Sequence, residues 1–597
     1  MLSSSSMNTD QQNKSTTSLV DEMAQLDKNY ENALKILDSL IARKVTSDVG
    51  GQEQNLEITT NCLKRIGVDI TKLPMIHVAG TKGKGSTCAF CETILRKNGL
   101  KTGLFTSPHL IDIRERIRIN GAPVSTELFG SAFWECYDKL CQSSLGGEKD
   151  LIAKTTYFRL LVVLAFKIFV DAGVDVAIIE VGIGGRYDAT NIIHPVVCGI
   201  SSIGYDHMEI LGNSLYEIAM QKAGIMKKHV PCITYPQREE AMDAFVKSSQ
   251  VSGSPLYMCP SIEDYERVLS EDGKIQRLEL GLKGEHQRWN ASLAIALAFA
   301  FMERTNRHEK LEIPSFSPLE ESIVIEKFKN KLRGEDLSSS QSSSKSSKSL
   351  SNIPSSLLNS NMSHIHNTQH VETFLPFHLP EAYINGLREC KWPGRCQVLS
   401  FPGLSFYIDG AHTDESLDLC RKWFVSCMEK NQVSQELDDH YYFSSDNEEN
   451  ALLTTERRKQ AQNAATTSTH KKVLVFNYTG PRDPKKLLTP LSKSSDLFDY
   501  VIFCPTDSVK NSLNKHHTSI SKQEEEKLNL LRQTWIDLTN KSDNILLFHS
   551  INEVLEFLWD MKSEKVSVLA TGSIYLIGDF SRKLHKIYKA ISKRDNK

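Results

Sequence analysis

Apolar residues recur with strand or helix spacing in the first part of the chain. From Tyr30 to Ile41 they follow a helical period, which predicts an amphipathic helix over "NYENALKILDSLIARK". "PMIHVAG" is a short apolar run that ends in glycine, and "GSTCAFCETILRKNGL" after it reads as a helix that stops at Gly99. Strand, glycine-rich turn and helix in this order are the context in which a phosphate-binding loop is expected.

Two further apolar runs, "VDVAIIEVG" and "PVVCGISSIGYDH", are continuous and rich in β-branched residues. Such runs are typical of central strands in a parallel sheet that is covered on both faces. The most apolar stretch, "YFRLLVVLAFKIFVDAGV", is interrupted by Arg159, Lys167 and Asp171, so it predicts a buried helix and no membrane span. The first domain is therefore expected to be an α/β phosphate-loop ATPase domain with a parallel sheet.

A second strand-helix pattern begins near Arg395. "LSFYID", "KVLVFN", "DYVIFC", "NILLFH" and "VSVLATG" alternate with helical stretches, which predicts a smaller, Rossmann-like α/β domain with a mostly parallel sheet. Two polar stretches, one of them dominated by serine, cannot bury enough apolar surface to offset their ordering entropy. The expected layout is a disordered N-terminus 1–20, an ATP- and substrate-binding domain 21–333, a Ser-rich disordered insertion 334–370, an interdomain segment 371–394, and a C-terminal domain 395–597 with a polar insertion at about 431–471.

Composition narrows the class of protein. The 597 residues carry a formal net charge of -2, which offers no electrostatic footprint for nucleic acid or an anionic membrane. Thirteen scattered cysteines without a regular framework indicate reduced thiols in a cytosolic-type compartment. Cys88 and Cys91 form a C-x-x-C, which we interpret as small apolar residues on a buried helix; a redox pair is the alternative.

The glycine-rich turn carries the first candidate chemistry. Gly80, Gly83 and Gly85 would let the backbone turn tightly and place amide groups around an anion at a helix N-terminus. Lys84 would then lie on the β- and γ-phosphates, and the Ser86 hydroxyl would bind phosphate or its metal ion. The alternative is a plain glycine-rich turn with a solvated lysine.

Polar side chains follow the neighbouring predicted strands. Glu180 ends one strand, at the sheet edge where ligands of open α/β sheets bind, and a carboxylate there suits Mg²⁺ bridging phosphate oxygens. A salt-bridged structural glutamate is the alternative. Asp206 and His207 reach the same edge, where His207 is either a metal ligand or an ordinary hydrogen-bonding group. Lys222 is expected at a helix end, where composition alone predicts a solvated cation.

In the second domain, "WPGRCQVL" and "FYIDGAHTDES" supply Arg395, Asp409 and His412. Arg395 is a candidate phosphate clamp, and Asp409, at a strand end, could accept hydrogen bonds from ribose hydroxyls. Purely structural roles remain open for all three residues.

The chain resembles the folylpolyglutamate and dihydrofolate synthase branch of the Mur ligases. The resemblance rests on "GTKGKGSTCAF", "TGLFTSPHLIDIRERIRINGAPVS", "IIEVGIGGRYDATN", "GYDHMEILG", "QKAGIMK", "GEHQRWNA", "WPGRCQVL", "IDGAHT" and "LATGSIYLIGD", which occur in family order. It extends from about Asn29 to the C-terminus, apart from the two polar insertions. "TKGKGS" with "SPHLIDIRERIRING" is similar to eukaryotic folylpolyglutamate synthases, whereas dihydrofolate synthases more often carry Asn at the position of Lys82.

The resemblance implies roles for individual residues. It implies an ATP site made of Gly83, Lys84, Gly85, Ser86, Asn290, Arg395 and Asp409, a Mg²⁺ site made of Ser107, Glu180 and His207, and catalytic roles for Lys84, Lys222 and His412. Lys222 matches a lysine that bacterial relatives carry as a carbamate. The loop "TSPHLIDIRERIRING" would cover the pteridine, with Arg114, Glu115 and Arg116 as candidate contacts; a solvated charged loop face is the alternative.

The implied reaction is a tetrahydrofolate:L-glutamate γ-ligase that forms ADP. ATP would convert the γ-carboxylate of a folate into an acyl phosphate, the amine of L-glutamate would attack it, and phosphate would leave. Closure of two domains around ATP would exclude water from the acyl phosphate. Three alternatives stay open: a dihydrofolate synthase or bifunctional enzyme, a small-molecule kinase, and a non-catalytic ATP-binding protein.

The remaining expectations concern partners and location. We expect a monomer that binds folates, L-glutamate and ATP, and no nucleic acid. Relatives also use a monovalent cation such as K⁺, for which the sequence has no readable ligand set. We expect a cytoplasmic protein; a mitochondrial form, in the matrix or associated with the inner membrane, is the alternative, because a second start at Met7 would shorten the Ser-rich leader.

Overall fold

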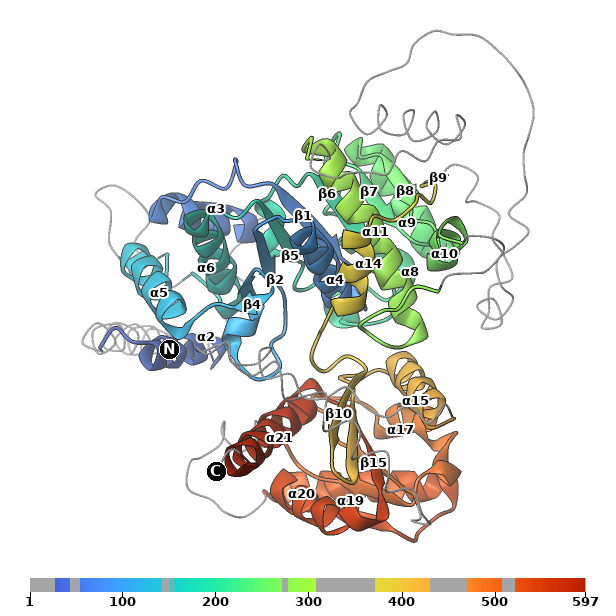
Figure 1. Cartoon of the computed structure of the whole chain (residues 1–597). Helices are drawn as coiled ribbons and strands as arrows, with labels where there is room; N and C mark the ends of the chain where they lie inside the picture. Colours follow the sequence, from blue (N-terminus) through green and yellow to red (C-terminus); the bar gives the residue numbers. More distant parts are fainter. Residues whose placement is uncertain are drawn as a thin grey trace, which may run out of the picture. The chain divides into compact units, whose positions relative to one another are not determined.

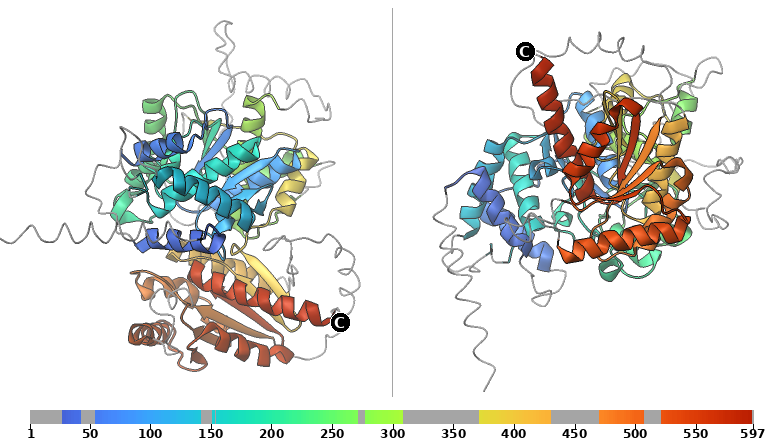
Figure 2. Two further views of the ribbon diagram at one scale, coloured as in Figure 1. Left: turned by 90° about the vertical axis from the view of Figure 1, so that its left-hand side faces the viewer. Right: turned by 90° about the horizontal axis from the view of Figure 1, so that it is seen from below.

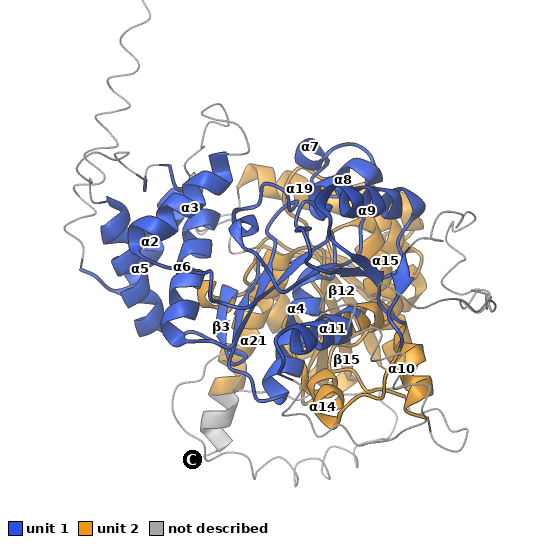
Figure 3. Ribbon diagram, turned by 90° about the horizontal axis from the view of Figure 1, so that it is seen from above, with its two compact units in different colours: residues 1–107, 116–260, 293–375 blue, residues 108–115, 261–292, 376–597 orange. Residues whose placement is uncertain are grey.

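Two sheets organise the chain, and each belongs to one of two compact units (Figures 1 and 3). Unit 1 comprises Met1–Ser107, Arg116–Pro260 and Leu293–Leu375, and unit 2 comprises Pro108–Glu115, Ser261–Ser292 and Pro376–Lys597. The computed structural model describes residues 27–42, 54–141, 151–152, 154–270, 277–307, 371–429, 470–506 and 521–595. The expected disordered N-terminus, the Ser-rich insertion and nearly all of the second polar insertion lie outside these residues.

Unit 1 is built on a nine-stranded sheet with the order β4-β3-β2-β5-β1-β6-β7-β8-β9. All neighbouring pairs are parallel except β2 with β3 and β3 with β4. The strands are β1 Met75–Ala79, β2 Thr102–Phe105, β3 Ile117–Ile119, β4 Ala122–Pro123, β5 Val176–Glu180, β6 Val197–Ile200, β7 Cys232–Thr234, β8 Leu256–Met258 and β9 Glu372–Thr373. The α-helices of unit 1 are α2 Tyr30–Ala42, α3 Gln54–Ile66, α4 Lys84–Lys97, α5 Thr126–Cys141, α6 Tyr157–Ala172, α7 Met208–Leu211, α8 Leu215–Ala223 and α9 Glu239–Ser252.

The predicted central strands of unit 1 are confirmed. Every residue of β1 and β5 is buried, because helices cover both faces of the sheet and both faces of each strand must therefore be apolar (Figure 1). The predicted buried helix is α6, whose first turn is capped by the side chain of Thr156. No helix within the described ranges is long and apolar enough to cross a membrane.

Cys88 and Cys91 lie on α4 with 0% exposure and form no disulfide. Burial raises the pKa of both thiols, so neither is a reactive thiolate. Their interpretation as packing residues of a helix is therefore confirmed.

Unit 2 is built on a six-stranded sheet with the order β10-β11-β15-β12-β13-β14. The five predicted strands are all present and parallel to one another, and the antiparallel edge strand β10 was not predicted. The strands are β10 Gln397–Phe401, β11 Leu404–Ile408, β12 Lys471–Phe476, β13 Tyr500–Phe503, β14 Ile545–Leu547 and β15 Val566–Thr571. The α-helices are α10 Ile262–Val268, α14 Glu381–Glu389, α15 Asp414–Glu429, α17 Pro484–Ser492, α19 Lys522–Thr539, α20 Ile551–Asp560 and α21 Ile574–Asp595, while α11 Glu285–Arg304 is divided between the two units.

Two segments of the expected first domain belong to unit 2, and so do residues 376–394 of the expected interdomain segment. Unit 2 includes Pro108–Glu115 and Ser261–Ser292, which the layout assigns to the first domain. Leu110 is the reason for the first difference, because it belongs to the hydrophobic core of unit 2. In the second segment, the Gly281 amide donates a hydrogen bond to the Leu387 carbonyl of α14. The spacing of apolar residues along the sequence predicts strands and helices, but it does not predict contacts of this kind between distant segments.

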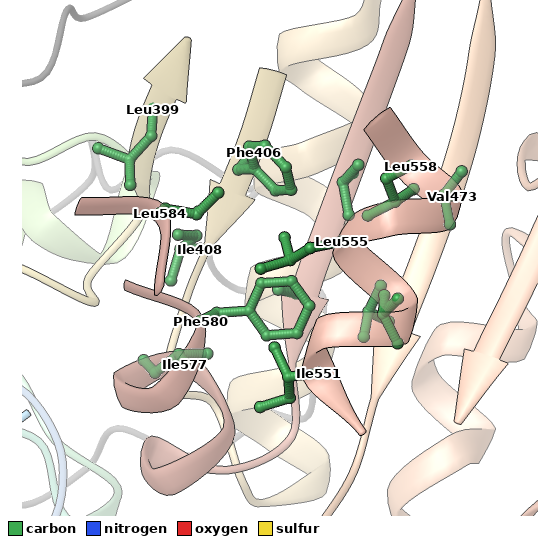
Figure 4. Packing of buried hydrophobic residues seen from close by; sticks show 14 of the residues in the cluster. Leu399, Phe406, Ile408, Val473, Ile551, Leu555, Leu558, Ile577, Phe580 and Leu584 are labelled. Atoms are coloured by element: carbon green, nitrogen blue, oxygen red, sulfur yellow. The ribbon is translucent and has the colours of Figure 1, made fainter. Parts of the chain in front are cut away.

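Helices cover both faces of the unit 2 sheet. On one face, α20 and α21 pack against β11, β12 and β15 (Figure 2), and Phe580 lies among the surrounding apolar side chains (Figure 4). On the other face, α15, α17 and α19 enclose a second apolar cluster around Trp535. The carboxyl ends of the parallel strands are left for polar loops, which is where such sheets bind ligands.

We expect Phe580→Ala to destabilise unit 2 by about 3–5 kcal/mol, because Phe580 is 0% exposed and its removal leaves a cavity in a closely packed cluster. Urea unfolding followed by tryptophan fluorescence would measure the change. Tyr575→Ala on the same helix is the matched control, since Tyr575 is 53% exposed and should change the midpoint little. Equal midpoint shifts in the two variants would contradict this account of the core.

Candidate active site

The phosphate loop follows β1. Gly80 has a φ of 146°, and a Cβ atom there would lie 1.9 Å from Ser201 Oγ, so only glycine fits. Gly83, with a φ of 83°, is the N-cap of α4, which begins at Lys84. Gly85 therefore lies in the first helical turn and not in the tight turn that the sequence suggested. The first amides of a helix have no acceptor within the helix itself, which favours an anion at this position.

The loop is held by the segment that follows β6. The Thr81 amide donates to the Ser202 carbonyl at 2.7 Å, and Ser201 Oγ donates to the Lys82 carbonyl at 2.7 Å. Lys82 Nζ also forms an ion pair with Asp206 at 2.8 Å. The cradle is thus preformed by the protein's own contacts.

Lys222 lies at the C-terminal end of α8, as predicted, but it is not a solvated cation. It is 4% exposed, and its Nζ donates a hydrogen bond of 2.9 Å to the Gly80 carbonyl. Burial, and next the nearby charge of Lys84, lower the pKa of Lys222 to about 7. A substantial share of Lys222 is therefore a neutral amine at neutral pH.

The loop after β5 fixes the end of α8. A Cβ atom on Gly185 would lie 2.8 Å from the Lys222 carbonyl oxygen, so the absence of a side chain permits this close approach. The Arg186 amide donates to the Gln221 carbonyl at 2.8 Å. The loop itself is tied down by Asp188, whose carboxylate accepts from the Ile183 amide at 3.0 Å.

His77 supports this loop from inside the sheet, and sequence reasoning missed it. Thr190 Oγ1 donates to Asp188 Oδ1 at 2.6 Å, so His77 Nε2, 2.9 Å from the same hydroxyl, is the donor to Thr190. Burial lowers the pKa of His77 to about 3, which keeps the imidazole neutral, and burial raises the pKa of Asp188. A lone polar residue in the apolar run "PMIHVAG" was the available signal.

Ser107 and Glu180 meet at the carboxyl ends of β2 and β5. The Ser107 amide donates to Glu180 Oε2 at 2.9 Å, and Glu180 is 4% exposed. A hydroxyl and a buried carboxylate are hard oxygen groups that fit Mg²⁺. Within the described part of the chain, no group of three His, Cys, Asp or Glu side chains could hold a metal without other ligands. Phosphate oxygens and water would therefore have to complete the coordination.

His207 starts α7 with a left-handed φ of 51°. Its side chain is 44% exposed, with Asp206 at 4.0 Å and Glu209 at 3.8 Å. Among the described residues, no hydrogen bond or ion pair joins His207 to Ser107 or Glu180. A direct contact therefore joins Ser107 and Glu180, and the metal role of the three residues stays a prediction.

Unit 2 positions Asp409 at the end of β11. Its carboxylate accepts from the Cys396 amide at 2.8 Å and from the Ala411 amide at 2.9 Å, so it first holds its own loop. Arg395 donates to the Gly394 carbonyl at 3.0 Å and lies beside Gly410.

Two further candidate residues of unit 2 lie near the start of α11. Asn290 is 2% exposed and donates to Gln287 Oε1 at 2.9 Å. His286 lies close enough to Asp409 and Arg395 for their charges to act on it, and burial lowers its pKa. The motif "GEHQRWNA" contains His286, but its sequence alone did not single this residue out.

His412 and Arg482 lie together at the same end of the unit 2 sheet. His412 Nδ1 and the Gly410 carbonyl are 2.8 Å apart, so Nδ1 is the donor, and the His412 carbonyl accepts from the Arg482 guanidinium. Thr479 Oγ1 and Ser573 Oγ follow two neighbouring strands and are 3.3 Å apart. Arg482 was missed because "GPRDPKK" reads only as a polar turn.

The loop "SPHLIDIRER" is more ordered than a solvated face. Glu115 accepts hydrogen bonds from three successive amides, each at 2.8 Å, at Leu110, Ile111 and Asp112. Arg116 is buried and its guanidinium lies 5.6 Å from the ring centroid of Tyr157. The solvated-face interpretation is therefore wrong for Glu115 and Arg116, and Glu115 shapes the loop.

These features define an α/β protein with a phosphate loop at the carboxyl edge of a parallel sheet and a smaller parallel-sheet unit, the Mur ligase architecture. The Mur ligase middle domain model matches residues 78–298. A Mycobacterium tuberculosis folylpolyglutamate synthase complexed with ADP shares the fold, with a TM-score of 0.58 and 19% identity, covering 92% of this chain and 98% of that one.

Sequence relatives specify the family. The human protein named folylpolyglutamate synthase, mitochondrial, is 36% identical over 80% of this chain and 68% of its own length. An Arabidopsis thaliana folylpolyglutamate synthase is 34% identical over 95% of this chain and 90% of its own. The chain belongs to the folylpolyglutamate synthase family.

We expect the stability of the protein relative to Lys222→Met to depend on pH. The folded pKa of about 7 lies below the usual 10.5, so the unfolded state binds more protons between these values. Wild-type stability should therefore rise with pH relative to the variant across this window, by up to about 1.4 kcal/mol per pH unit, with no further change below pH 7. Denaturant unfolding in CO₂-free buffers would measure the difference. A difference independent of pH would contradict the burial of a free amine.

Proposed function

We propose that the chain joins L-glutamate to the γ-carboxyl group of tetrahydrofolates and their polyglutamates, with conversion of ATP to ADP and phosphate. The observation that carries this proposal is the Lys222 amine, buried against the phosphate-loop carbonyl of Gly80 in a member of this family. If the protein does not catalyse the reaction described below, only its assignment to the Mur ligase architecture stands.

The reaction needs activation because a carboxylate is a poor electrophile. Transfer of the γ-phosphoryl group to the folate carboxylate forms an acyl phosphate and ADP. Attack by the glutamate amine then forms the amide, expels phosphate and releases a proton. The amides at the start of α4 and the Lys84 side chain would hold phosphate oxygens and offset the charge that develops on them. No protein nucleophile takes part.

Ser107, Glu180 and His207 are the residues that would hold Mg²⁺, which when bound would neutralise charge on the phosphates. The chain's own contribution is to orient these groups. The Ser107 amide fixes one oxygen of Glu180, and the backbone amide of His207 donates to Asp206.

Unit 2 contains further candidate ligand-binding residues. Arg395, Asp409 and Asn290 are proposed to bind ATP. The similar Mycobacterium tuberculosis protein is complexed with ADP, which supports an adenine nucleotide as a ligand. His412, whose Nδ1 donates to the Gly410 carbonyl, is proposed to contact the nucleotide or the glutamate. The Arg482 guanidinium has only the His412 carbonyl as a partner among the described residues, which leaves donors for a carboxylate of the incoming amino acid.

Lys222 is proposed to carry a carbamate. Only a neutral amine reacts with CO₂, and the lowered pKa of about 7 provides one at neutral pH. Modification would replace a cation beside Lys84 by an anion, while the remaining N–H could still donate to the Gly80 carbonyl.

With ¹³C-bicarbonate at pH 7.5, we expect a single carbamate signal in the ¹³C spectrum, absent in Lys222→Arg. The arginine variant is the control because it keeps a cation of similar length that cannot be carbamylated. An unchanged signal in Lys222→Arg would assign the carbamate elsewhere, and no signal in the wild type would remove this part of the proposal.

Location, oligomeric state and K⁺ remain predictions. The relatives include proteins named as mitochondrial, and we propose a cytoplasmic protein with a mitochondrial form. We also propose a monomer that uses K⁺ as an accessory ion.

Incubation with Mg-ATP, tetrahydrofolate and L-glutamate should yield folates that grow by one glutamyl unit at a time, with one ADP per unit. We expect Lys84→Ala to lower turnover by at least about 100-fold, because its charge offsets that of the transferred phosphate. Mass spectrometry and ADP release measure both. Turnover of dihydropteroate alone would indicate a dihydrofolate synthase, a phosphorylated product without an amide would indicate a kinase, and ADP binding without turnover a non-catalytic protein.

A further inference from the structure

Lys82 is the phosphate-loop residue to which the proposed reaction gives no role. In the structure, Lys82 Nζ lies 2.8 Å from Asp206 Oδ2, with side-chain exposures of 29% and 17%. The Lys82 charge is therefore engaged by a carboxylate from the segment after β6.

The Lys82 backbone is equally constrained. Its carbonyl accepts from Ser201 Oγ at 2.7 Å, and its amide donates to the Ser202 carbonyl at 3.3 Å. Because both backbone groups are fixed, the side chain starts from a defined point and reaches Asp206 with a reduced entropy cost. An ion pair made by a side chain with a fixed backbone is stronger than one between two freely moving surface side chains.

The second oxygen of Asp206 continues the connection. The His207 amide donates to Asp206 Oδ1 at 3.1 Å, so one carboxylate joins Lys82 to the His207 backbone. His207 has a left-handed φ of 51°, a conformation that a residue with a Cβ adopts at some cost. Strain of this kind persists only where surrounding contacts hold it, and it is concentrated at functional sites.

We propose that Lys82 is a positioning residue that acts through Asp206 on His207. The Lys82–Asp206 pair holds the start of α7 against the phosphate loop, so that the His207 imidazole is placed for a divalent cation bound to the nucleotide phosphates. This inference rests on the proposed function only in taking Mg²⁺ and an adenine nucleotide as ligands. It assigns Lys82 no contact with phosphate.

The test compares ADP affinity with Mg²⁺ and with EDTA, by calorimetry on the full-length protein. The ratio of the two affinities reports the cation's contribution, and outer partners of metal ligands typically change metal affinity by 10- to 100-fold. We expect Lys82→Met to lower the affinity with Mg²⁺ more than the affinity in EDTA, so that this ratio falls by about 10-fold. Lys82→Arg, which keeps the charge, should restore most of the ratio.

Further variants separate positioning from folding. Asp206→Asn should reproduce the loss, and the double variant Lys82→Met/Asp206→Asn should add nothing, because both changes break one connection. Lys28→Met is the matched control: it removes an ion pair of 2.5 Å with Asp138 whose side chains are 56% and 42% exposed. It should leave both affinities unchanged.

Two results would overturn the inference. An equal loss of ADP affinity in EDTA would show that Lys82 meets phosphate directly. An unchanged ratio in Lys82→Met would reduce the pair to a surface contact. If the wild type shows the expected ratio but adds no glutamate to folate, the proposed function fails and the positioning role stands, so the two failures are distinguishable.

Discussion

The hydrogen bond from Lys222 to the Gly80 carbonyl is the contact on which the site of unit 1 depends. It ties the end of α8 to the first residue of the phosphate loop, 142 positions away in sequence. Burial of the amine, and next the nearby charge of Lys84, lower the pKa of Lys222 to about 7. The hydrogen bond holds the loop, and the burial of the same amine determines its chemical form.

Glycine makes that contact possible at both ends. A Cβ atom on Gly80 would lie only 1.9 Å from Ser201 Oγ, so the phosphate loop can follow this path only with glycine there. Gly185 likewise lets the loop after β5 approach the Lys222 carbonyl. The buried chain of His77, Thr190 and Asp188 then keeps the second loop in place. The phosphate loop and the loop after β5 are therefore held by close backbone approach and by a buried polar network, whereas the sheet of unit 1 is held mainly by apolar packing.

The sequence predicted the parts of the fold that follow from local pattern. The all-buried strands β1 and β5 and the five parallel strands of unit 2 are mainly apolar runs, so their places in the two sheets could be predicted from the sequence. β10 was missed because Gln397 and Ser400 interrupt its apolar positions, as expected at a sheet edge. The inclusion of Leu110 in the core of unit 2 was unreadable, since it depends on a contact with residues far along the chain.

The sequence predicted which residues belong to the candidate site better than it predicted what each residue contacts. The types and order of Lys84, Glu180 and Asp409 indicated phosphate and metal chemistry, but spacing could not show that Glu180 accepts the Ser107 amide or that Asp409 holds two backbone amides. Hydrogen bonds from backbone amides occupy some of the acceptor positions of each carboxylate and also fix the orientation of the carboxylate. A carboxylate in a site is useful to a ligand only after the protein has fixed its direction.

Three lysines around one loop illustrate how environment divides a single chemical type. Lys222 is buried with a backbone carbonyl as its hydrogen-bond acceptor, and its pKa falls. Lys82 is matched by Asp206, so its charge serves to hold protein to protein. Lys84, at the first position of α4, is joined to the Thr81 carbonyl only at 3.5 Å, the weakest of the three attachments. The lysine least committed to the protein is the one best able to turn to a phosphate, and this follows from its partners and not from its place in the motif.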